Sequence, residues 1–196
     1  IVKVVRERSE HCMVIVDEAW GGHLRFNSEL PTSAMGAGAD IAVQSTHKMA
    51  GGLQQTGLIH WREERVDTEL LEEAYREYVT TSPSYALLAS ADAAVRALAA
   101  DGEWLLDEQI ARTRRFKALL RERLPDLDLM DDELHADHPN VSGIDLIKTT
   151  VGVSRYSITG YDIAEHLVER RIVVEKAGVQ TLTFITTFQL ADEAVE

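Results

Sequence analysis

The sequence predicts an α/β fold, in which buried strands alternate with helices. Two short apolar runs, His11–Val16 and Asp40–Gln44, each end in polar residues next to glycine-containing turns. From Asp67 onward the apolar residues recur at helical spacing instead. After Pro125 the composition becomes acidic and rich in turn residues. We therefore expect a larger domain over residues 1–125 and the start of a smaller α+β domain over residues 126–196.

Local patterns predict the elements of the larger domain. The runs His11–Val16 and Asp40–Gln44 are expected to be fully buried strands of the parallel kind, and Leu30–Met35 leaves room for one or two helical turns. A third strand is expected at Gly57–Trp61. Helices are predicted from Asp67 to Tyr78, over Tyr85–Ala100, and from Glu103 to Leu124, where Pro125 ends the last one.

The smaller domain is predicted to begin with a strand near Ile144–Thr150 and a helix over Tyr161–Arg171. Thr159 and Asp162 have the spacing of a capping box at the start of that helix. Two further strands are expected at Ile172–Lys176 and Thr181–Phe188.

Composition excludes several classes of protein. No apolar run is long enough to cross a membrane, and no secretory signal is visible in the first residues. The single cysteine, Cys12, permits no intrachain disulfide, which fits a cytoplasmic protein. A formal net charge of −13 argues against nucleic-acid and anionic-membrane partners. We identify no metal site in the sequence.

The informative residues follow the first two predicted strands. Ligands of open α/β sheets bind beyond the carboxyl ends of the strands, and Asp17 and Lys48 both lie at such ends. Pyridoxal-5′-phosphate (PLP) chemistry needs this pair, because a lysine amine condenses with the aldehyde and a carboxylate keeps the pyridine nitrogen protonated. Taken singly, each is equally a solvated loop or strand-end residue. Ser45 and Thr46 supply hydroxyls suited to a phosphate or to capping the next turn.

Longer segments carry a family resemblance. Asp17-Glu-Ala-Trp-Gly-Gly-His23 and Gly38-Ala-Asp-Ile-Ala-Val-Gln-Ser-Thr-His-Lys48 resemble the prokaryotic-type ornithine/lysine/arginine decarboxylases, which are fold-type-I, aspartate-aminotransferase-like PLP enzymes. The resemblance continues in residues 55–60, 80–85, 159–161 and 172–176. It implies that residues 1–125 are the C-terminal part of a PLP-binding large domain with its interdomain helix. Residues 126–196 would begin the small domain.

The resemblance also implies roles for residues around the cofactor. Lys48 would form the Schiff base, Asp17 would pair with the pyridinium nitrogen, and Ala19 would pack on the ring face. His47 would line the site as a further catalytic residue, and Ser45 would contact the phosphate.

Three more residues have an implied role and an ordinary alternative. Trp20 would lie near the phenolic oxygen and position it, or is a core aromatic. Thr80 and Ser82 would reach the phosphate of a neighbouring subunit, or only stop one helix and start the next. If Thr80 and Ser82 reach the phosphate of a neighbouring subunit, the protein is a homodimer or higher homo-oligomer with a shared active site.

Two residues are candidates for substrate binding. Glu175 would approach the distal amine of a cationic amino acid, or is a solvated strand residue. His23 matches a histidine of some relatives, or is structural.

The resemblance implies PLP-dependent α-decarboxylation of a basic amino acid, namely lysine, arginine or ornithine. Aminotransfer or other PLP chemistry on a cationic amino acid would use the same Lys48 and Asp17. A third alternative is a non-catalytic relative that acts as an interaction or regulatory subunit, against which the retained pair argues.

The family also carries, before this point, a Gly/Ser/Thr loop for the phosphate and an aromatic residue that stacks on the ring. Only sixteen residues precede Asp17. We therefore expect a fragment of a longer enzyme, whose exposed strands would not form a stable cofactor site alone. Stoichiometric PLP binding by the 196-residue chain would contradict this expectation.

Overall fold

The computed structural model describes residues 1–130, 138, 140–188 and 190. They form two compact units, residues 1–28 with 32–103 and residues 29–31 with 104–196. Helix α4 (Tyr85–Arg123) contributes residues to both units. The packing thus changes inside this helix, whereas the predicted domain boundary at 125/126 lies just beyond its end and stays a prediction.

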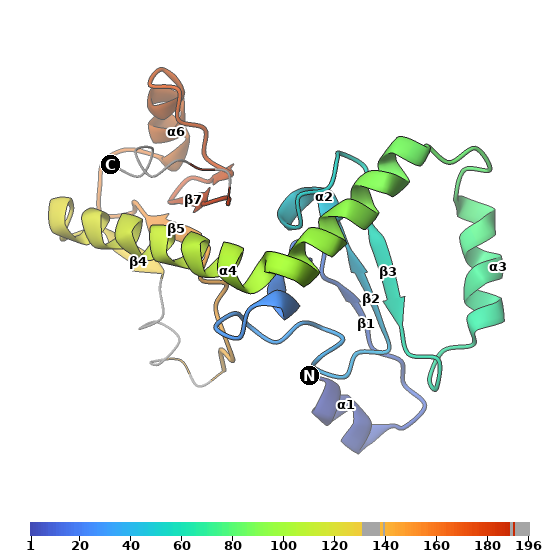
Figure 1. The fold of residues 1–196 in the computed structure, drawn as a ribbon. Helices are drawn as coiled ribbons and strands as arrows, with labels where there is room; N and C mark the ends of the chain where they lie inside the picture. Colours follow the sequence, from blue (N-terminus) through green and yellow to red (C-terminus); the bar gives the residue numbers. More distant parts are fainter. Residues whose placement is uncertain (131–137, 139, 189, 191–196) are drawn as a thin grey trace. The chain divides into compact units, whose positions relative to one another are not determined.

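The first unit is built on a three-stranded sheet in the order β1-β2-β3 (Figure 1). Strand β1 (Ile15–Asp17) pairs parallel with β2 (Ile41–Gln44), and β2 pairs antiparallel with β3 (Leu58–Trp61). All three strands were expected, and the parallel pair confirms the α/β class. The carboxyl ends of β1 and β2 therefore meet at one edge of the sheet.

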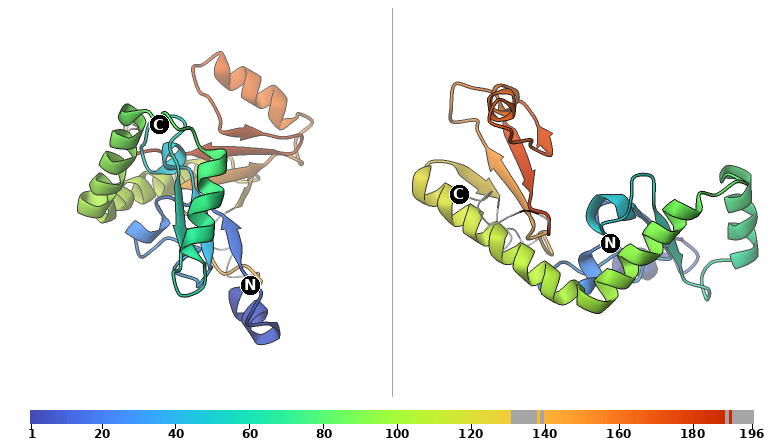
Figure 2. Two further views of the ribbon diagram at one scale, coloured as in Figure 1. Left: turned by 90° about the vertical axis from the view of Figure 1, so that its right-hand side faces the viewer. Right: turned by 45° about the horizontal axis from the view of Figure 1, so that its top comes forward.

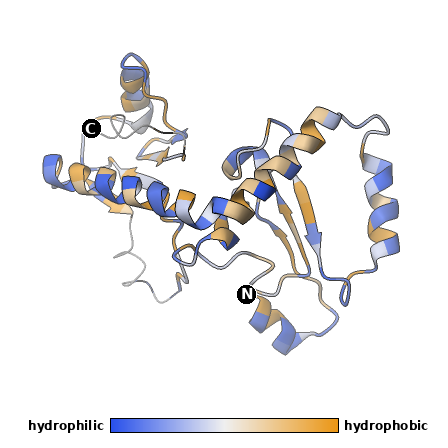
Figure 3. Cartoon of the chain, in the orientation of Figure 1, coloured by the Kyte–Doolittle hydropathy of each residue, from blue (hydrophilic) through white to orange (hydrophobic). Residues whose placement is uncertain are grey.

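One face of this sheet is covered and the other is open. Val14 and Ala42 pack with Ala34 and Ala39 from the connection between β1 and β2. The prediction that the first two strands are fully buried is wrong, because Ile15 is 65% exposed. Successive side chains of a strand point to opposite faces, and among the described residues the face that carries Ile15 has little cover. The strands are nevertheless mostly apolar (Figure 3).

The helices of the first unit differ in part from expectation. Helix α3 (Thr68–Tyr78) is confirmed, and Asp67 caps it by accepting hydrogen bonds from the backbone of Glu69 and Leu70. Helix α1 (Val2–Arg8) was not predicted. Residues 34–38 form successive turns and no helix, although the Ala37 N–H donates to the Ser33 carbonyl at 2.8 Å. A single helical turn therefore lies slightly after the start of the expected segment Leu30–Met35.

Helix α4 is one continuous helix of 39 residues, so the predicted break between Ala100 and Glu103 is wrong. Glycine costs about 1 kcal/mol in a helix interior, which favoured a break at Gly102. In the structure Gly102 is buried, and a β-carbon there would lie 3.0 Å from the β-carbon of Phe26. The missing side chain lets Phe26 approach the helix, and this packing outweighs the poor helix propensity.

The second unit contains an antiparallel sheet in the order β4-β5-β7-β6 and helix α6 (Gly160–Val168) (Figure 2). The strands are β4 (Asp128–Met130), β5 (Lys148–Gly152), β6 (Lys176–Ala177) and β7 (Thr181–Ile185). Val151, Val153 and Leu182 form the core, on which Ile163 of α6 and Leu120 of α4 pack. The expected capping box of Thr159 and Asp162 is present.

Strands β5 and β7 and helix α6 confirm the predictions for this unit, with α6 ending earlier than expected. The strand predicted at Ile172–Lys176 is wrong, because only Lys176 of that range is in a strand. Arg171 adopts a left-handed φ of 64° after α6, and Ile172 and Val173 are exposed. Strand β4 was missed, and residues 131–137 and 139 of the predicted acidic turn region lie outside the described residues. No helix in the described part of the chain is both long and apolar enough to span a membrane.

Candidate functional site

Asp17 and Lys48 come together because their strands are parallel neighbours. Asp17 is the last residue of β1 and pairs with Val43 of β2. Lys48 follows β2 in the short helix α2 (Thr46–Met49). The two strand ends are also joined beyond the sheet, because the Ser45 N–H donates to the carbonyl oxygen of Ala19 at 3.2 Å. Ala19, Asp17 and Ser45 thus lie at one edge with Lys48, as expected from the sequence.

The Lys48 amine is exposed, with Nζ 5.1 Å from the centroid of the Trp20 ring. Among the described residues no carboxylate forms an ion pair with this amine. Trp20 therefore lies next to the lysine and contacts its amine by a weak cation–π interaction, and its predicted positioning role stays a prediction.

The Asp17 carboxylate is exposed and has one acceptor in use. Its Oδ1 accepts a hydrogen bond from the Ala19 N–H at 3.0 Å, which forms a tight turn directly after β1. None of the described residues donates to Oδ2. The turn fixes the carboxylate at the strand end and leaves its second oxygen for an outside donor.

Buried hydrogen bonds of two threonines stabilise the turn that carries Lys48. The buried Thr46 hydroxyl donates to Thr56 Oγ1 at 2.6 Å, and the Thr56 hydroxyl donates to the Leu53 carbonyl at 2.7 Å. A β-carbon on Gly52 would lie 2.5 Å from Thr56 Oγ1, so only glycine fits beside this pair.

His47 and Ser45 flank the lysine with defined roles in hydrogen bonding. His47 Nδ1 lies 2.8 Å from the Thr56 carbonyl oxygen, which can only accept. Nδ1 therefore carries a proton, which leaves Nε2 for a second partner. The Ser45 side chain precedes α2 without capping it, so its hydroxyl is not used by the helix.

The other predicted residues lie elsewhere. Thr80 and Ser82 are exposed between α3 and α4, where Thr80 Oγ1 accepts from the Ser82 N–H at 3.1 Å. They do end one helix and precede the next. His23 is completely buried, which favours its structural interpretation. Glu175 is exposed in the second unit, and its N–H donates to the Thr183 carbonyl at 2.9 Å. The roles of all four stay predictions.

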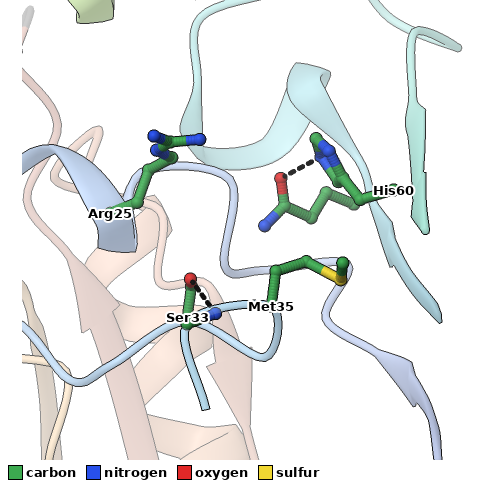
Figure 4. A pocket seen from close by; sticks show the side chains of 6 residues that line it. Arg25, Ser33, Met35 and His60 are labelled. Carbon is green, nitrogen blue, oxygen red and sulfur yellow. Dashed lines mark hydrogen bonds between the residues drawn. The ribbon is translucent and has the colours of Figure 1, made fainter. Parts of the chain in front are cut away.

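Sequence reasoning missed a polar group on the covered face of the sheet. A pocket of about 380 Å³ is lined by Arg25, Ser33, Met35, Gly36, Gln44 and His60 (Figure 4). Burial first, and then the nearby Arg25 charge, lower the pKa of His60, while Glu18 opposes the shift. The sequence shows Glu18 and Gln44 only as polar residues beside apolar runs, and nothing in it indicates that they pair with each other or with His60.

The donors and acceptors of Lys48, Asp17, Ser45 and His47 indicate which chemistry these residues can support. An exposed amine can condense with an aldehyde, and a fixed carboxylate oxygen can accept a hydrogen bond from a protonated ring nitrogen. A hydroxyl and a ring nitrogen beside the lysine can bind further polar atoms. These residues fit a planar, aldehyde-bearing cofactor with an anionic substituent.

Comparisons with known proteins agree with this arrangement. The family model for Orn/Lys/Arg decarboxylase, major domain, matches residues 1–135. An arginine decarboxylase of Bacillus subtilis (strain 168) is 36% identical over 178 residues, covering 89% of this chain and 35% of that relative. The chain thus spans about a third of the relative's length.

Two solved structures share the fold. The Francisella novicida lysine decarboxylase matches with a TM-score of 0.76 at 23% identity, over 92% of this chain and 30% of that one. The Sphingomonas wittichii serine palmitoyltransferase matches with a TM-score of 0.70 at 20% identity, over 99% of this chain and 46% of that one. The structural likeness supports the fold, and the sequence match over residues 1–135 defines the family. This chain belongs to the Orn/Lys/Arg decarboxylase family.

Proposed function

We propose that the protein is a PLP-dependent enzyme that removes the α-carboxylate of a basic amino acid. The observation that carries the proposal is the meeting of Lys48 and Asp17 at the adjoining ends of β1 and β2. Family membership adds the reaction class, since the similar proteins named above include an arginine decarboxylase and a lysine decarboxylase.

The residues of this chain divide the work of holding the cofactor. Lys48 would attach it covalently, and Asp17 would accept the hydrogen bond of its ring nitrogen. The Ser45 hydroxyl would donate to the phosphate, and Ala19 would pack on the ring face. Trp20 and His47 position the polar groups around the lysine. When bound, PLP supplies the electron sink that loss of CO₂ from the α-carbon requires.

Asp17 is the residue on which the chemistry depends most. A carboxylate held by the Ala19 N–H would offer its charge to the ring nitrogen and would favour the protonated form of that nitrogen. A neutral side chain in the same place would accept the hydrogen bond without stabilising the positive charge.

The substrate is proposed to be cationic, and Glu175 is the candidate partner of its distal amine. Replacing Glu175 by Gln removes the charge and keeps the shape. The expected result is a raised KM for lysine, arginine or ornithine with little change in kcat. An unchanged KM for all three would remove Glu175 from the site.

The first experiment is borohydride reduction of the complete gene product after incubation with PLP, followed by peptide mass analysis. We expect one reduced PLP adduct on Lys48, and none in Lys48→Ala. Absence of the adduct in the unmodified protein would favour a non-catalytic relative. Product analysis then separates the reactions, because CO₂ with a diamine or agmatine indicates decarboxylation and a keto acid indicates aminotransfer.

We also propose that Thr80 and Ser82 complete the site of a neighbouring subunit. Protomers with Lys48→Ala and protomers with Thr80→Ala and Ser82→Ala should each be impaired. Mixed oligomers of the two should regain activity, because some sites then contain both intact parts. Failure of the mixture to exceed either parent would restrict these residues to their own chain.

A further inference from the structure

The covered face of the first sheet carries a hydrogen-bond chain that runs from Glu18 through Gln44 to His60. The Glu18 carboxylate accepts from the Ala34 N–H at 2.7 Å and from Gln44 Nε2 at 2.6 Å. Gln44 Oε1 in turn lies 3.0 Å from His60 Nε2 (Figure 4). We call these three side chains the Glu18 chain.

The Glu18 chain adjoins the candidate cofactor site at two points. Glu18 directly follows Asp17, and Gln44 directly precedes Ser45. The backbone repeats the connection, because the Glu18 N–H donates to the Val43 carbonyl at 2.9 Å. The contact between Glu18 and Gln44 therefore joins the ends of β1 and β2 on the covered face, while the alternation of side chains along β1 places Asp17 on the opposite face.

The direction of every hydrogen bond in the chain follows from Glu18. A carboxylate only accepts, so the amide nitrogen of Gln44 must face it and the amide oxygen must face His60. His60 must then carry its proton on Nε2. The Gly21 carbonyl, 3.4 Å from Gln44 Nε2, is a second acceptor that favours the same amide orientation.

Gly21 leaves the space that the Glu18 side chain occupies. A β-carbon on Gly21 would lie 2.2 Å from Glu18 Cγ and 2.6 Å from Cδ. Glycine is thus required for the Glu18 side chain to fold back over the turn after β1. The bonds are partly buried, where a lost partner costs more than in water.

We propose that Glu18 and Gln44 are positioning residues, which hold the strand ends that carry Asp17 and Lys48 in register and fix the proton of His60 on Nε2. The inference rests on the proposed function for its link to PLP, and on the hydrogen-bond directions for the rest. The inference predicts that PLP binding and the position of the His60 proton depend on the order of donors and acceptors in the Glu18 chain, and not on the volume of its side chains.

A charge-conserving exchange tests this order in the complete gene product. Glu18→Gln is nearly isosteric, but its amide nitrogen can donate to Gln44 only if Gln44 turns its own amide nitrogen away from the Gly21 carbonyl and toward His60. Gln44→Glu puts two carboxylates together. The double variant Glu18→Gln with Gln44→Glu restores the order along the three side chains, because Gln at 18 accepts from Ala34 and donates to Glu at 44, which also accepts from His60. It gives up only the 3.4 Å contact of residue 44 with the Gly21 carbonyl. Glu72→Gln, which removes an exposed charge paired with Arg76 on α3, is the matched control.

Each single variant should weaken PLP retention about tenfold, measured as the equilibrium dissociation constant by absorbance of the lysine-bound cofactor. The double variant should recover most of that loss, and the control should match the unmodified protein. If a single variant is insoluble, recovery of soluble protein in the double variant supports the same conclusion. A double variant no better than the single ones by any of these measures would refute the inference.

A second measurement does not depend on the cofactor. Nitrogen-15 NMR of selectively labelled histidine should show His60 protonated on Nε2 in the unmodified protein and on Nδ1 in Glu18→Gln, where Gln44 turns its amide. An unchanged His60 tautomer would contradict the proposed direction of the chain. If the unmodified protein does not bind PLP through Lys48, the proposed function fails, while the tautomer experiment still decides the hydrogen-bond order.

Discussion

Asp40 and Asp17 are the same residue type at opposite ends of the same pair of strands, and their surroundings differ completely. Asp40, just before β2, is fully buried and accepts from Arg6 Nη2 at 2.6 Å, from Arg65 Nε at 3.0 Å and from the Val14 N–H at 2.6 Å. Asp17, at the end of β1, is exposed and accepts only from the Ala19 N–H among the described residues. A satisfied carboxylate stabilises the fold, whereas an unsatisfied one is available to a ligand.

The largest expected effect comes from the satisfied carboxylate. Asp40→Asn leaves two arginines facing a neutral amide and should lower the free energy of unfolding by roughly 3 kcal/mol. Urea denaturation of the protein measures this change. A loss below about 1 kcal/mol would show that Arg6 and Arg65 find solvent instead.

The pH dependence of stability should come next. Burial by itself raises the pKa of Asp40, but the hydrogen bonds from Arg6, Val14 and Arg65 outweigh it and hold the pKa at about 2, against an ordinary 3.8. Because the folded pKa is depressed, the stabilisation is present above pH 4 and is lost as the pH falls from about 4 to about 2. It amounts to about 2 kcal/mol. Acid unfolding monitored by circular dichroism should show this loss, and the Asp40→Asn variant should lack it.

Asp67 provides an intermediate case, since it is exposed but accepts from two backbone N–H groups at the start of α3. Asp67→Ala should cost about 1 kcal/mol through loss of the helix cap. Hydrogen exchange of α3 should quicken, because this helix buries none of its residues and has little else to hold it. Asp67→Asn, which keeps the acceptor, is the control and should change exchange little.

The smallest effect on stability is expected at Asp17. Asp17→Asn keeps an acceptor for the Ala19 N–H, so the free energy of unfolding should change by less than about 0.5 kcal/mol. PLP binding should nevertheless weaken strongly, because the charge that holds the ring nitrogen protonated is gone. A large loss of stability would instead make Asp17 structural and would weaken the contrast with Asp40.

The sequence was sufficient to predict that Asp17 and Lys48 lie at one edge of the sheet, and insufficient to predict the polar group on its covered face. Asp17 and Lys48 belong to residue types with a defined chemistry, and each follows an apolar run, so their meeting could be expected. Gln44 and His60 are joined only by the antiparallel pairing of β2 with β3, and nothing local to either residue reveals that partner. The proposed positioning role of Glu18 was not predicted, because the sequence argument assigned its neighbour Asp17 the role at this strand end.

Elements were missed where distant packing decides the local structure. Helix α1 is only seven residues long, yet Arg6 ties it to Asp40, and Val2 and Val5 pack on the core. Helix α4 continues through Gly102 because Phe26, far away in sequence, fills the space. Local propensity could not register either contact.

Two acidic residues in succession leave the end of β1 with an ambiguous register. A slip of one residue in a strand transfers every side chain to the other face, and here it would exchange Asp17 for Glu18. Glu18 has a longer side chain, and in front of the sheet it would present the same charge at the wrong depth. On the covered face, Gly21 leaves space for the longer Glu18 side chain and Gln44 donates a hydrogen bond to it. The hydrogen bonds of Glu18 on the covered face thereby fix the register that places Asp17 on the opposite face, where the chemistry is proposed to occur.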